Sequence, residues 1–317
     1  MLATDYRLSQ PELFRRDVIA GLSKPRKSLP SRWLYDERGS ELFEEITQLE
    51  EYYPTRVETG ILRLNAAEIA GFVGKGATLI EYGAGAGIKT EILIAALEAP
   101  RFYVPVDISG DFLDQAVISL RHRFPQIGIW PIVADFTGEF EIPAGIPLKG
   151  RSAFFPGSTI GNLDHSETIS FLRRVHRHVG AKGTAVIGAD LTKDARVLRA
   201  AYNDRQGITA AFNLNLLARI NRELDGDFKL DRFAHEARWN NMSSAVEMHL
   251  VSLQAQTVTV DGQTFDFEAG ESIHTETSRK YDVRTLSALV ESAGWYIDEM
   301  WTDPRQSFGV FGLASLG

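Results

Sequence analysis

Cysteine is missing from this chain of 317 residues, and its absence excludes disulfides, thiolate metal sites and cysteine nucleophiles. A chain without cysteine fits a reducing compartment, and we expect the cytoplasm. The seven histidines are scattered, and the sequence around His235 lacks the HExxH pattern of a zinc peptidase, so we predict no metal. Three histidines stand among arginines in amphipathic segments and are expected to be solvated: His122, His176 and His178.

Clustered positive charge and long apolar runs are also lacking. The formal net charge is −8 and no run of five basic residues occurs, whereas binding nucleic acid independently of sequence needs a cationic face. No uncharged apolar stretch approaches the ~20 residues of a membrane helix. The first 22 residues mix acids and bases, unlike a signal peptide. We expect a monomer that acts on a small molecule and binds neither nucleic acid nor membrane.

Apolar and amphipathic segments alternate from about residue 61 to 194. This pattern predicts a parallel sheet with helices on both faces. The predicted strands are 78–83, 101–107, 130–136, 152–159 and 183–190, with 295–301 and 308–314 near the end of the chain. The predicted helices are 58–72, 89–98, 111–124, 166–179 and 283–294.

The remaining segments follow other patterns. Residues 39–54 read as one helix that Pro54 stops or bends. Beyond 195, two helices are expected at 194–202 and 207–223, then alternating strands at 235–241, 245–252, 256–260, 264–267 and 271–278. We predict a Rossmann-like core of 61–194 plus 281–317. A second α+β domain, which binds the substrate, comprises 1–60 plus 195–280.

A glycine-rich turn follows the first predicted strand of this core, in LIEYGAGAGIKTE. Gly83, Gly85 and Gly87 permit a sharp turn and close approach of a ligand to the backbone. A dinucleotide fingerprint needs G-x-G-x-x-G, but Ile88 occupies the sixth position. The preceding Glu81 suits the ammonium or sulfonium of S-adenosylmethionine, which this turn therefore favours.

Two acidic residues end the next two predicted strands. Asp107 is suited to accept both ribose hydroxyls of an adenosine. Asp135 is suited to accept the adenine amino group, with Phe136 packed on the ring. The alternative is that both aspartates only cap the helices that follow them. Turn and acids together predict an α/β fold of the class I methyltransferase type, with S-adenosylmethionine as methyl donor.

The loop FFPGSTIGNLD after the fourth strand is expected beside the methyl group of this donor. Gly157 and Gly161 allow tight turns, and Asn162 can both donate and accept hydrogen bonds. An ordinary Asn/Gly turn is the alternative interpretation.

Several long segments resemble the histidine-specific N-alpha-methyltransferases of ergothioneine biosynthesis. They are LPSRWLYDERGSELFEEITQLEEYYPTR, PGSTIGNL, ADLTKD, AYND, GITAAFNLNLLARINRELDGDF and HEARWN, and the resemblance runs from about residue 29 to the C-terminus. It implies trimethylation of the α-amine of histidine to hercynine, using three equivalents of S-adenosylmethionine. It also implies a Rossmann-like core with a second domain built from the N-terminal segment and an insertion.

The resemblance assigns roles to individual residues. Those implied for the cofactor are Gly83, Lys89, Asp107, Asp135 and Phe136. For the substrate, Asn162 and Tyr202 hold the carboxylate, Tyr52, Glu276 and Ser278 hold the imidazole, Met248 lines the side-chain pocket, and Tyr35 and Gly157 lie near the amine. One departure is visible: the family more often has serine or threonine where this turn has Ala84 and Ala86.

Strand alternation in SIHTETS is expected to put His274, Glu276 and Ser278 on one face, within reach of one ligand. A solvated surface strand is the alternative, and for Met248 the alternative is core packing. The alternative enzyme is a member of the same family that methylates another amino acid or an indole amine. An indole, however, has no acceptor nitrogen and cannot balance the charge of Glu276. A regulatory protein that binds the cofactor without turnover is the non-enzyme alternative.

Overall fold

The computed structural model describes residues 9–85 and 87–316. Its helices are α1 (Gln10–Leu22), α2 (Glu37–Thr47), α3 (Tyr53–Leu64), α4 (Ala66–Val73), α5 (Ile88–Ala96), α6 (Gly110–Arg123), α7 (His165–Val179), α8 (Ala195–Ala201), α9 (Ile208–Glu223) and α10 (Val283–Glu291), with 3-10 turns η1 (Ser31–Leu34), η2 (Thr159–Asn162) and η3 (Leu230–Arg232). None of the helices in this described part is long and apolar enough to cross a membrane.

The strands form a large sheet and two smaller ones. They are β1 (Thr78–Tyr82), β2 (Phe102–Asp107), β3 (Gly128–Ile129), β4 (Ile132–Val133), β5 (Arg151–Phe155), β6 (Thr184–Asp190), β7 (Phe233–Asn240), β8 (Ala245–Ser252), β9 (Gln256–Val260), β10 (Gln263–Phe267), β11 (Ser272–Arg279), β12 (Trp295–Thr302) and β13 (Phe308–Ser315). The large sheet has the order β12-β13-β6-β5-β1-β2-β3, with β4 also paired to β2. Its strands are parallel except β12 and β13.

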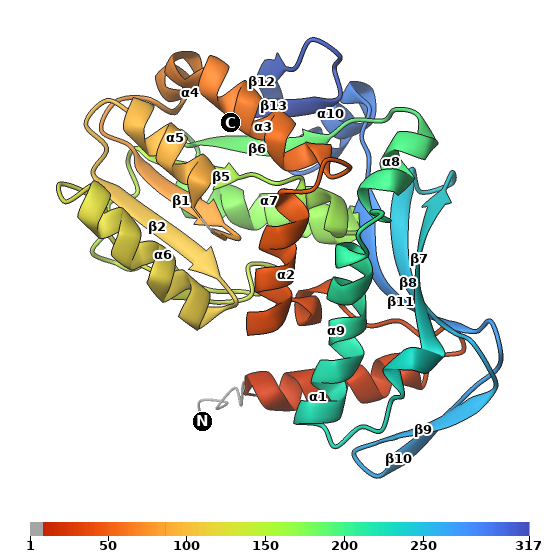
Figure 1. Cartoon of the computed structure of the whole chain (residues 1–317). Coiled ribbons are helices and arrows are strands. Elements are labelled where there is room, and N and C mark those ends of the chain that lie inside the picture. Colours follow the sequence, from red (N-terminus) through yellow and green to blue (C-terminus); the bar gives the residue numbers. More distant parts are fainter. Residues whose placement is uncertain (1–8, 86, 317) are drawn as a thin grey trace.

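Helices cover both faces of the large sheet (Figure 1). Alternate residues of each strand join different apolar clusters: Leu79 packs with α3 to α6, whereas Ile80 packs with α7 and α10. Alternation of this kind follows from the two-residue period of a strand. The predicted fold class is confirmed: this is the strand order of a class I methyltransferase, with extra sheets.

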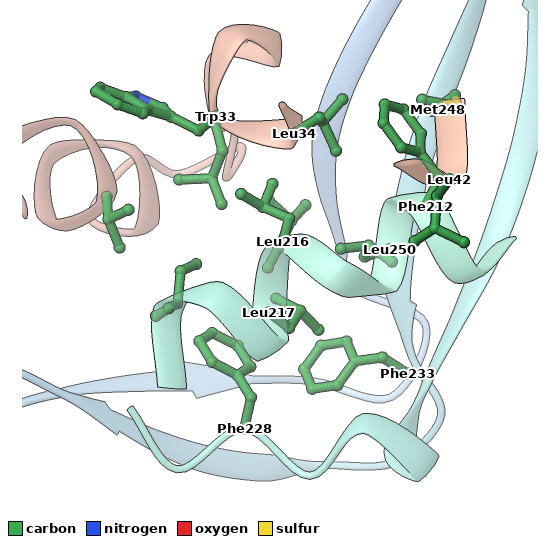
Figure 2. Packing of buried hydrophobic residues seen from close by; sticks show 14 of the residues in the cluster. Trp33, Leu34, Leu42, Phe212, Leu216, Leu217, Phe228, Phe233, Met248 and Leu250 are labelled. Atoms are coloured by element: carbon green, nitrogen blue, oxygen red, sulfur yellow. The ribbon is translucent and has the colours of Figure 1, made fainter. Parts of the chain in front are cut away.

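A separate apolar cluster joins the N-terminal segment to the residues after β6. Trp33 and Leu42 from the N-terminal helices pack against Phe212 and Leu216 of α9 and Leu250 of β8 (Figure 2). The antiparallel sheet β11-β8-β7 and the hairpin β9-β10 complete this part. Residues 27–29 lie along the edge of β11, where Leu29 N donates to His274 O at 2.8 Å. We propose that the domain boundaries are those predicted above, because this cluster draws on 14–52 and 198–273.

Three local predictions were wrong. The helix expected over 39–54 ends at Thr47, and Pro54 instead occupies the first turn of α3, where its missing N–H costs nothing. The helix expected over 58–72 is divided at Asn65 into α3 and α4. The third strand, expected over 130–136, is reduced to the two short strands β3 and β4, because Pro131 between them has no N–H for the ladder.

Candidate active site

A cleft of ≈ 560 Å³ opens at the carboxyl ends of β1, β2 and β4. Gly83 and Gly85 line it and have φ values of 72° and 49°, a conformation that favours glycine. A Cβ at Gly85 would meet no atom within 4 Å, so the backbone of the turn faces open space. Open sheets of this type bind ligands at this edge. Ala84 is buried, and Ala86 lies outside the described residues.

Asp107 lies at this edge, as predicted. Its Oδ1 accepts from Ser109 N at 2.9 Å, and its Oδ2 is 3.4 Å from Gly85 N. Burial raises the pKa of this carboxyl, and the backbone N–H groups oppose the rise. A carboxylate has about four acceptor positions, so Asp107 retains capacity for two ligand hydroxyls in the cleft.

Asp135 and Phe136 line the next part of the cleft. Asp135 Oδ1 accepts from the amide and hydroxyl of Thr137 at 2.8 and 2.6 Å, and its Oδ2 lies 3.3 Å from Arg32 Nη1. The ring of Phe136 packs on Phe155 with centroids 5.4 Å apart. Sequence reasoning missed Arg32, which comes from η1 and brings a cation to this wall.

Two expected cofactor contacts have other partners. The interpretation of Glu81 was wrong: its carboxylate is buried beneath the turn, where Oε2 accepts from Thr90 and Tyr103 at 2.5 Å each, and burial raises its pKa to about 8. Lys89 pairs with the buried Glu58, with Nζ 2.5 Å from Oε2. In the described part of the chain, Lys89 does not line the cleft.

Glu58 was missed by sequence analysis, because α3 gives no sign that one of its carboxylates faces inward. Besides Lys89, it accepts from Gly157 N at 2.9 Å with both oxygens. A Cβ at Gly188 would lie 2.0 Å from Glu58 Oε1, so β6 accommodates this carboxylate only because a glycine stands there. Glu58 thus ties the start of α5 to the loop after β5.

A smaller inner cavity of ≈ 40 Å³ adjoins the cleft. Tyr35, Phe43, Thr159, Asn162 and Glu276 line both, so the two spaces meet at these side chains. The other residues around the inner cavity are Ile46, Tyr52, Gly157, Ser158, Ala201, Tyr202, Thr209, Phe212, Met248 and Ser278. The structure therefore brings together Tyr35, Gly157 and the six predicted substrate-binding residues, Asn162 among them.

The loop after β5 reaches this cavity through close backbone packing. A Cβ at Gly161 would lie 2.7 Å from Arg279 O, so the glycine allows η2 to press against β11. Asn162, the next residue, consequently faces the cavity from the side of the cleft. Gly157 has φ 84°, and Ser158, which is also left-handed, accepts a hydrogen bond from Asp190 N with its Oγ at 2.9 Å.

Glu276 is 7% exposed, and its Oε2 has no hydrogen-bond partner among the described residues. Burial raises its pKa to about 7, and the nearby Lys280 limits the rise. A buried carboxylate oxygen without a partner costs free energy, so it marks a position for a donor or a cation from a ligand.

A β-bulge corrects the expected alternation in β11. His274 pairs with His249 and Glu276 pairs with Met248, with a register shift between them. His274 therefore faces the opposite side of the sheet from Glu276, where its ring lies 5.2 Å from that of His249. The expectation that His274 shares the face of Glu276 and Ser278 was wrong, because the extra residue, Thr275, interrupts the two-residue period.

Aromatic rings form the remaining walls. Tyr52 lies between Tyr202 and Phe43, at centroid distances of 6.0 and 6.1 Å. Burial is the main cause that raises the pKa of Tyr35 and Tyr52 well above the ordinary value, and nearby ionisable groups, Glu276 among them, add to the rise. Both side chains are therefore neutral phenols. Met248 is 2% exposed and belongs to the apolar cluster of Figure 2, so it lines the cavity and packs in the core at once.

The histidines do not form a metal site. In residues 9–85 and 87–316, no group of three His, Asp or Glu side chains is placed to hold a metal ion. One expectation about them was wrong: His178 is 8% exposed, and its ring nitrogens lie 3.0 Å from Tyr82 Oη and 3.1 Å from Phe140 O. Arg177 beside it is exposed, but Arg174, one helical turn earlier, is buried as His178 is, so arginine neighbours in the sequence do not identify a solvated face.

The donors and acceptors of the cleft fit S-adenosylmethionine: an open glycine turn, a carboxylate for a diol and an aromatic ring for a base. Comparison with known proteins agrees. A family model described as "Histidine-specific methyltransferase, SAM-dependent" matches residues 14–315. The chain is 42% identical over 303 residues to "Histidine N-alpha-methyltransferase" of Mycobacterium tuberculosis, covering 93% of each chain.

Two further relatives extend the match. The protein of the same name from Mycolicibacterium smegmatis is 42% identical over 308 residues, covering 95% of each chain. "Ergothioneine biosynthesis protein 1" of Neurospora crassa is 34% identical over 226 residues, which are 68% of this chain and 26% of that one. The suspected resemblance is confirmed: this chain belongs to the family of S-adenosylmethionine-dependent, histidine-specific methyltransferases.

Proposed function

We propose that this protein methylates the α-amine of L-histidine three times, forming N-alpha-trimethylhistidine (hercynine), a step of ergothioneine biosynthesis. The observation that carries the proposal is the buried Glu276 carboxylate, whose unpartnered oxygen lines a cavity that opens into the cofactor cleft. An imidazole offers nitrogen partners to such a group, whereas a purely apolar side chain does not. Membership of a histidine-specific family supports the same assignment.

The cofactor roles follow the edge of the large sheet. We propose that Asp107 accepts the ribose hydroxyls, that Asp135 accepts the adenine amino group, and that Phe136 packs on the base. The turn at Gly83 provides backbone contact. When bound, S-adenosylmethionine supplies a methyl group already activated by its sulfonium. For Lys89 we propose contact with the methionine carboxylate of the cofactor. This contact requires the Lys89 ammonium either to leave Glu58 or to bind both carboxylates at once.

The substrate roles follow the inner cavity. Asn162 and Tyr202 hold the carboxylate of histidine, and Tyr52, Glu276 and Ser278 hold its ring, with Met248 against the ring face. These contacts fix both ends of the amino acid, so the amine between them lies near Tyr35 and Gly157, where the cavity meets the cleft. Orientation of this kind can supply much of a rate enhancement, because the reacting pair then behaves as one molecule.

Loss of the amine proton precedes each transfer, since a protonated amine has no lone pair. Tyr35 does not serve as a phenolate base near neutral pH, because burial and the proximity of Glu276 raise its pKa. Its phenol oxygen can accept a hydrogen bond from the amine, so we assign Tyr35 an orienting role. A water in the adjoining cleft is the proposed proton acceptor.

The proposed setting is the cytoplasm, with the protein active as a monomer on a free amino acid. Neither a metal ion nor nucleic acid takes part in this proposal. The absence of cysteine and the negative net charge support these points. Activity that is unchanged by a chelator and by nuclease would agree with them, and a loss of activity under either treatment would contradict them.

One experiment tests the substrate directly. The protein is incubated with S-adenosylmethionine and, separately, each common amino acid and tryptamine, and the products are analysed by mass spectrometry. We expect mass gains of one, two and three methyl groups on histidine, with the trimethylated product accumulating. Methylation of tryptophan or an indole amine in preference to histidine would favour the alternative member of the family. Cofactor binding without any methylated product would indicate a regulatory protein.

A further inference from the structure

A buried ammonium lies directly behind the inner cavity. Lys280 follows β11 and exposes none of its side chain, and its Nζ is 2.9 Å from Asp190 Oδ2. The same Nζ lies 3.0 Å from Tyr202 Oη and 2.7 Å from Ser278 Oγ. An ammonium has three hydrogens and no acceptor. All three are therefore used, and the two hydroxyl oxygens each accept one of them.

The two hydroxyls also contact each other. Tyr202 Oη and Ser278 Oγ are 2.7 Å apart, so one of them donates to the other. Each hydroxyl has one hydrogen. One of the two hydrogens therefore lies between the oxygens, and the other remains for a ligand in the cavity. The hydroxyl that keeps the free hydrogen can donate to a ligand, whereas the other can only accept. This difference determines whether Ser278 offers a donor or an acceptor to a bound ring.

The roles proposed above, on which this inference rests, decide that question. If Tyr202 donates to the substrate carboxylate, the hydrogen between the two oxygens belongs to Ser278. Ser278 then faces the ring only as an acceptor, and ionised Glu276 is an acceptor as well. We propose that Lys280 is a positioning residue that holds this arrangement, so that histidine binds with one extra proton, taken from solvent and shared between its imidazole and Glu276.

The buried charges around the cavity leave one place for that proton. Asp190 and Glu276 are anionic, while Lys280 and Lys193 are cationic, the last with Nζ 2.6 Å from Asp190 Oδ1. These four charges sum to zero, but both ammonium groups contact Asp190, whereas Glu276 Oε2 contacts no donor among the described residues. The ring of a bound ligand can therefore bring the added proton to this oxygen. Buried charges persist when they are paired.

Few other groups compete for the proton on Glu276. Three phenols face it: Tyr35 after η1, Tyr52 before α3 and Tyr202 after α8, and burial raises the pKa of each, so they stay neutral. Lys280 is the cation whose charge acts on Glu276 from its own strand. The proton taken up on binding is therefore held by the ring and Glu276 together.

Calorimetry with N-alpha-trimethylhistidine tests the inference, because its trimethylammonium group cannot titrate. The protein, saturated with S-adenosylhomocysteine, is titrated at pH 8 in phosphate and in Tris, whose ionisation enthalpies differ. The difference in heat counts the protons exchanged. We expect uptake of close to one proton per ligand, and uptake near zero would overturn the inference.

Three variants identify the residues responsible. Ser278→Ala removes the acceptor at the ring, so proton uptake should fall by more than half. Lys280→Met should weaken the binding of trimethylhistidine at least tenfold and also reduce the uptake, with S-adenosylhomocysteine affinity unchanged. Lys193→Met is the matched control, because Lys193 pairs with the same Asp190 but contacts neither Tyr202 nor Ser278. This control should retain both the affinity and the proton uptake.

The outcomes separate the inference from the proposed function. Absence of both trimethylhistidine binding and histidine methylation would refute the proposed function itself. Binding and methylation without proton uptake would refute only the inference. Equal losses in Lys193→Met and Lys280→Met would show that Lys280 merely neutralises Asp190. If Lys280→Met does not fold, the proton uptake of the wild-type protein and of Ser278→Ala still tests the inference.

Discussion

The substitution Glu276→Gln should make the protein more stable and its substrate binding weaker. In the folded chain the pKa of Glu276 is about 7, against 4.5 for an ordinary glutamate, because burial disfavours the charged form. A folded-state pKa above the unfolded one means that stability falls as pH rises between the two values. Glutamine has the same shape and never ionises, so it escapes this loss.

The magnitude follows from the two pKa values. The difference between 4.5 and about 7, at about 1.4 kcal/mol per pH unit, means that ionised Glu276 costs the fold about 3 kcal/mol above pH 7. At pH 4.5 and below, the cost is absent. For binding, a charge-assisted hydrogen bond to the ring becomes a neutral one, which costs about 1–2 kcal/mol, or about five- to thirtyfold in histidine affinity.

Urea unfolding without ligand, from pH 4.5 to 8, measures the first effect, and calorimetric titration of histidine measures the second. We expect the stability advantage of the glutamine variant to grow from pH 4.5 to about 7 and then to level off. Glu81→Gln is the control: it removes another buried carboxyl, with a pKa of about 8, outside the cavity, and should leave histidine affinity unchanged. A Glu276→Gln variant with wild-type stability at pH 8 and wild-type affinity would refute the reasoning.

Three other substitutions test the remaining parts of the site. Asp107→Asn should lower the affinity for S-adenosylmethionine, measured by calorimetry, at least tenfold, because an amide oxygen accepts hydrogen bonds from a diol less strongly than a carboxylate does. Unchanged cofactor affinity would contradict the ribose assignment. Glu58→Gln should loosen both Lys89 and the Gly157 loop, lowering kcat in steady-state assays more than tenfold, and unchanged kcat would remove Glu58 from the positioning machinery. Gly161→Ala adds a methyl 2.7 Å from Arg279 O, so it should cost about 1–3 kcal/mol in urea unfolding and raise the histidine KM; normal values of both would show that η2 can shift freely.

Much of the architecture was predictable because the core strands and helices repeat a simple pattern. Leu79 and Ile80 belong to a short apolar run that ends in glycine, and such a run between amphipathic helices specifies a buried parallel strand. Pro54 was misread because a proline that ends one helix and a proline that starts the next give the same local signal.

Parts of the site depend on contacts that no local pattern reveals. The Glu58 carboxylate acquires its partners only when α3 packs against Lys89 and the Gly157 loop. Gly157 lies 99 positions after Glu58 in the chain. Lys280 looks like a solvated residue at a strand end, yet it is fully buried against Asp190. The bulge at Thr275 likewise depends on pairing with β8, which a single strand sequence cannot show.

The inner cavity has walls that come from widely separated parts of the chain, and this has a consequence for folding. The glycine turn and Asp107, which define the cofactor side, are near neighbours in sequence, and parallel pairing of β1 with β2 aligns them. Tyr35 and Glu276 face each other across the substrate side only after nearly the whole chain has been made. Long-range contacts of this kind form slowly, since their loop-closure entropy must be overcome first. The large sheet behind the cofactor side also includes β13 and β12, the last strands of the chain, so during synthesis we expect affinity for either ligand only when nearly the whole chain is available.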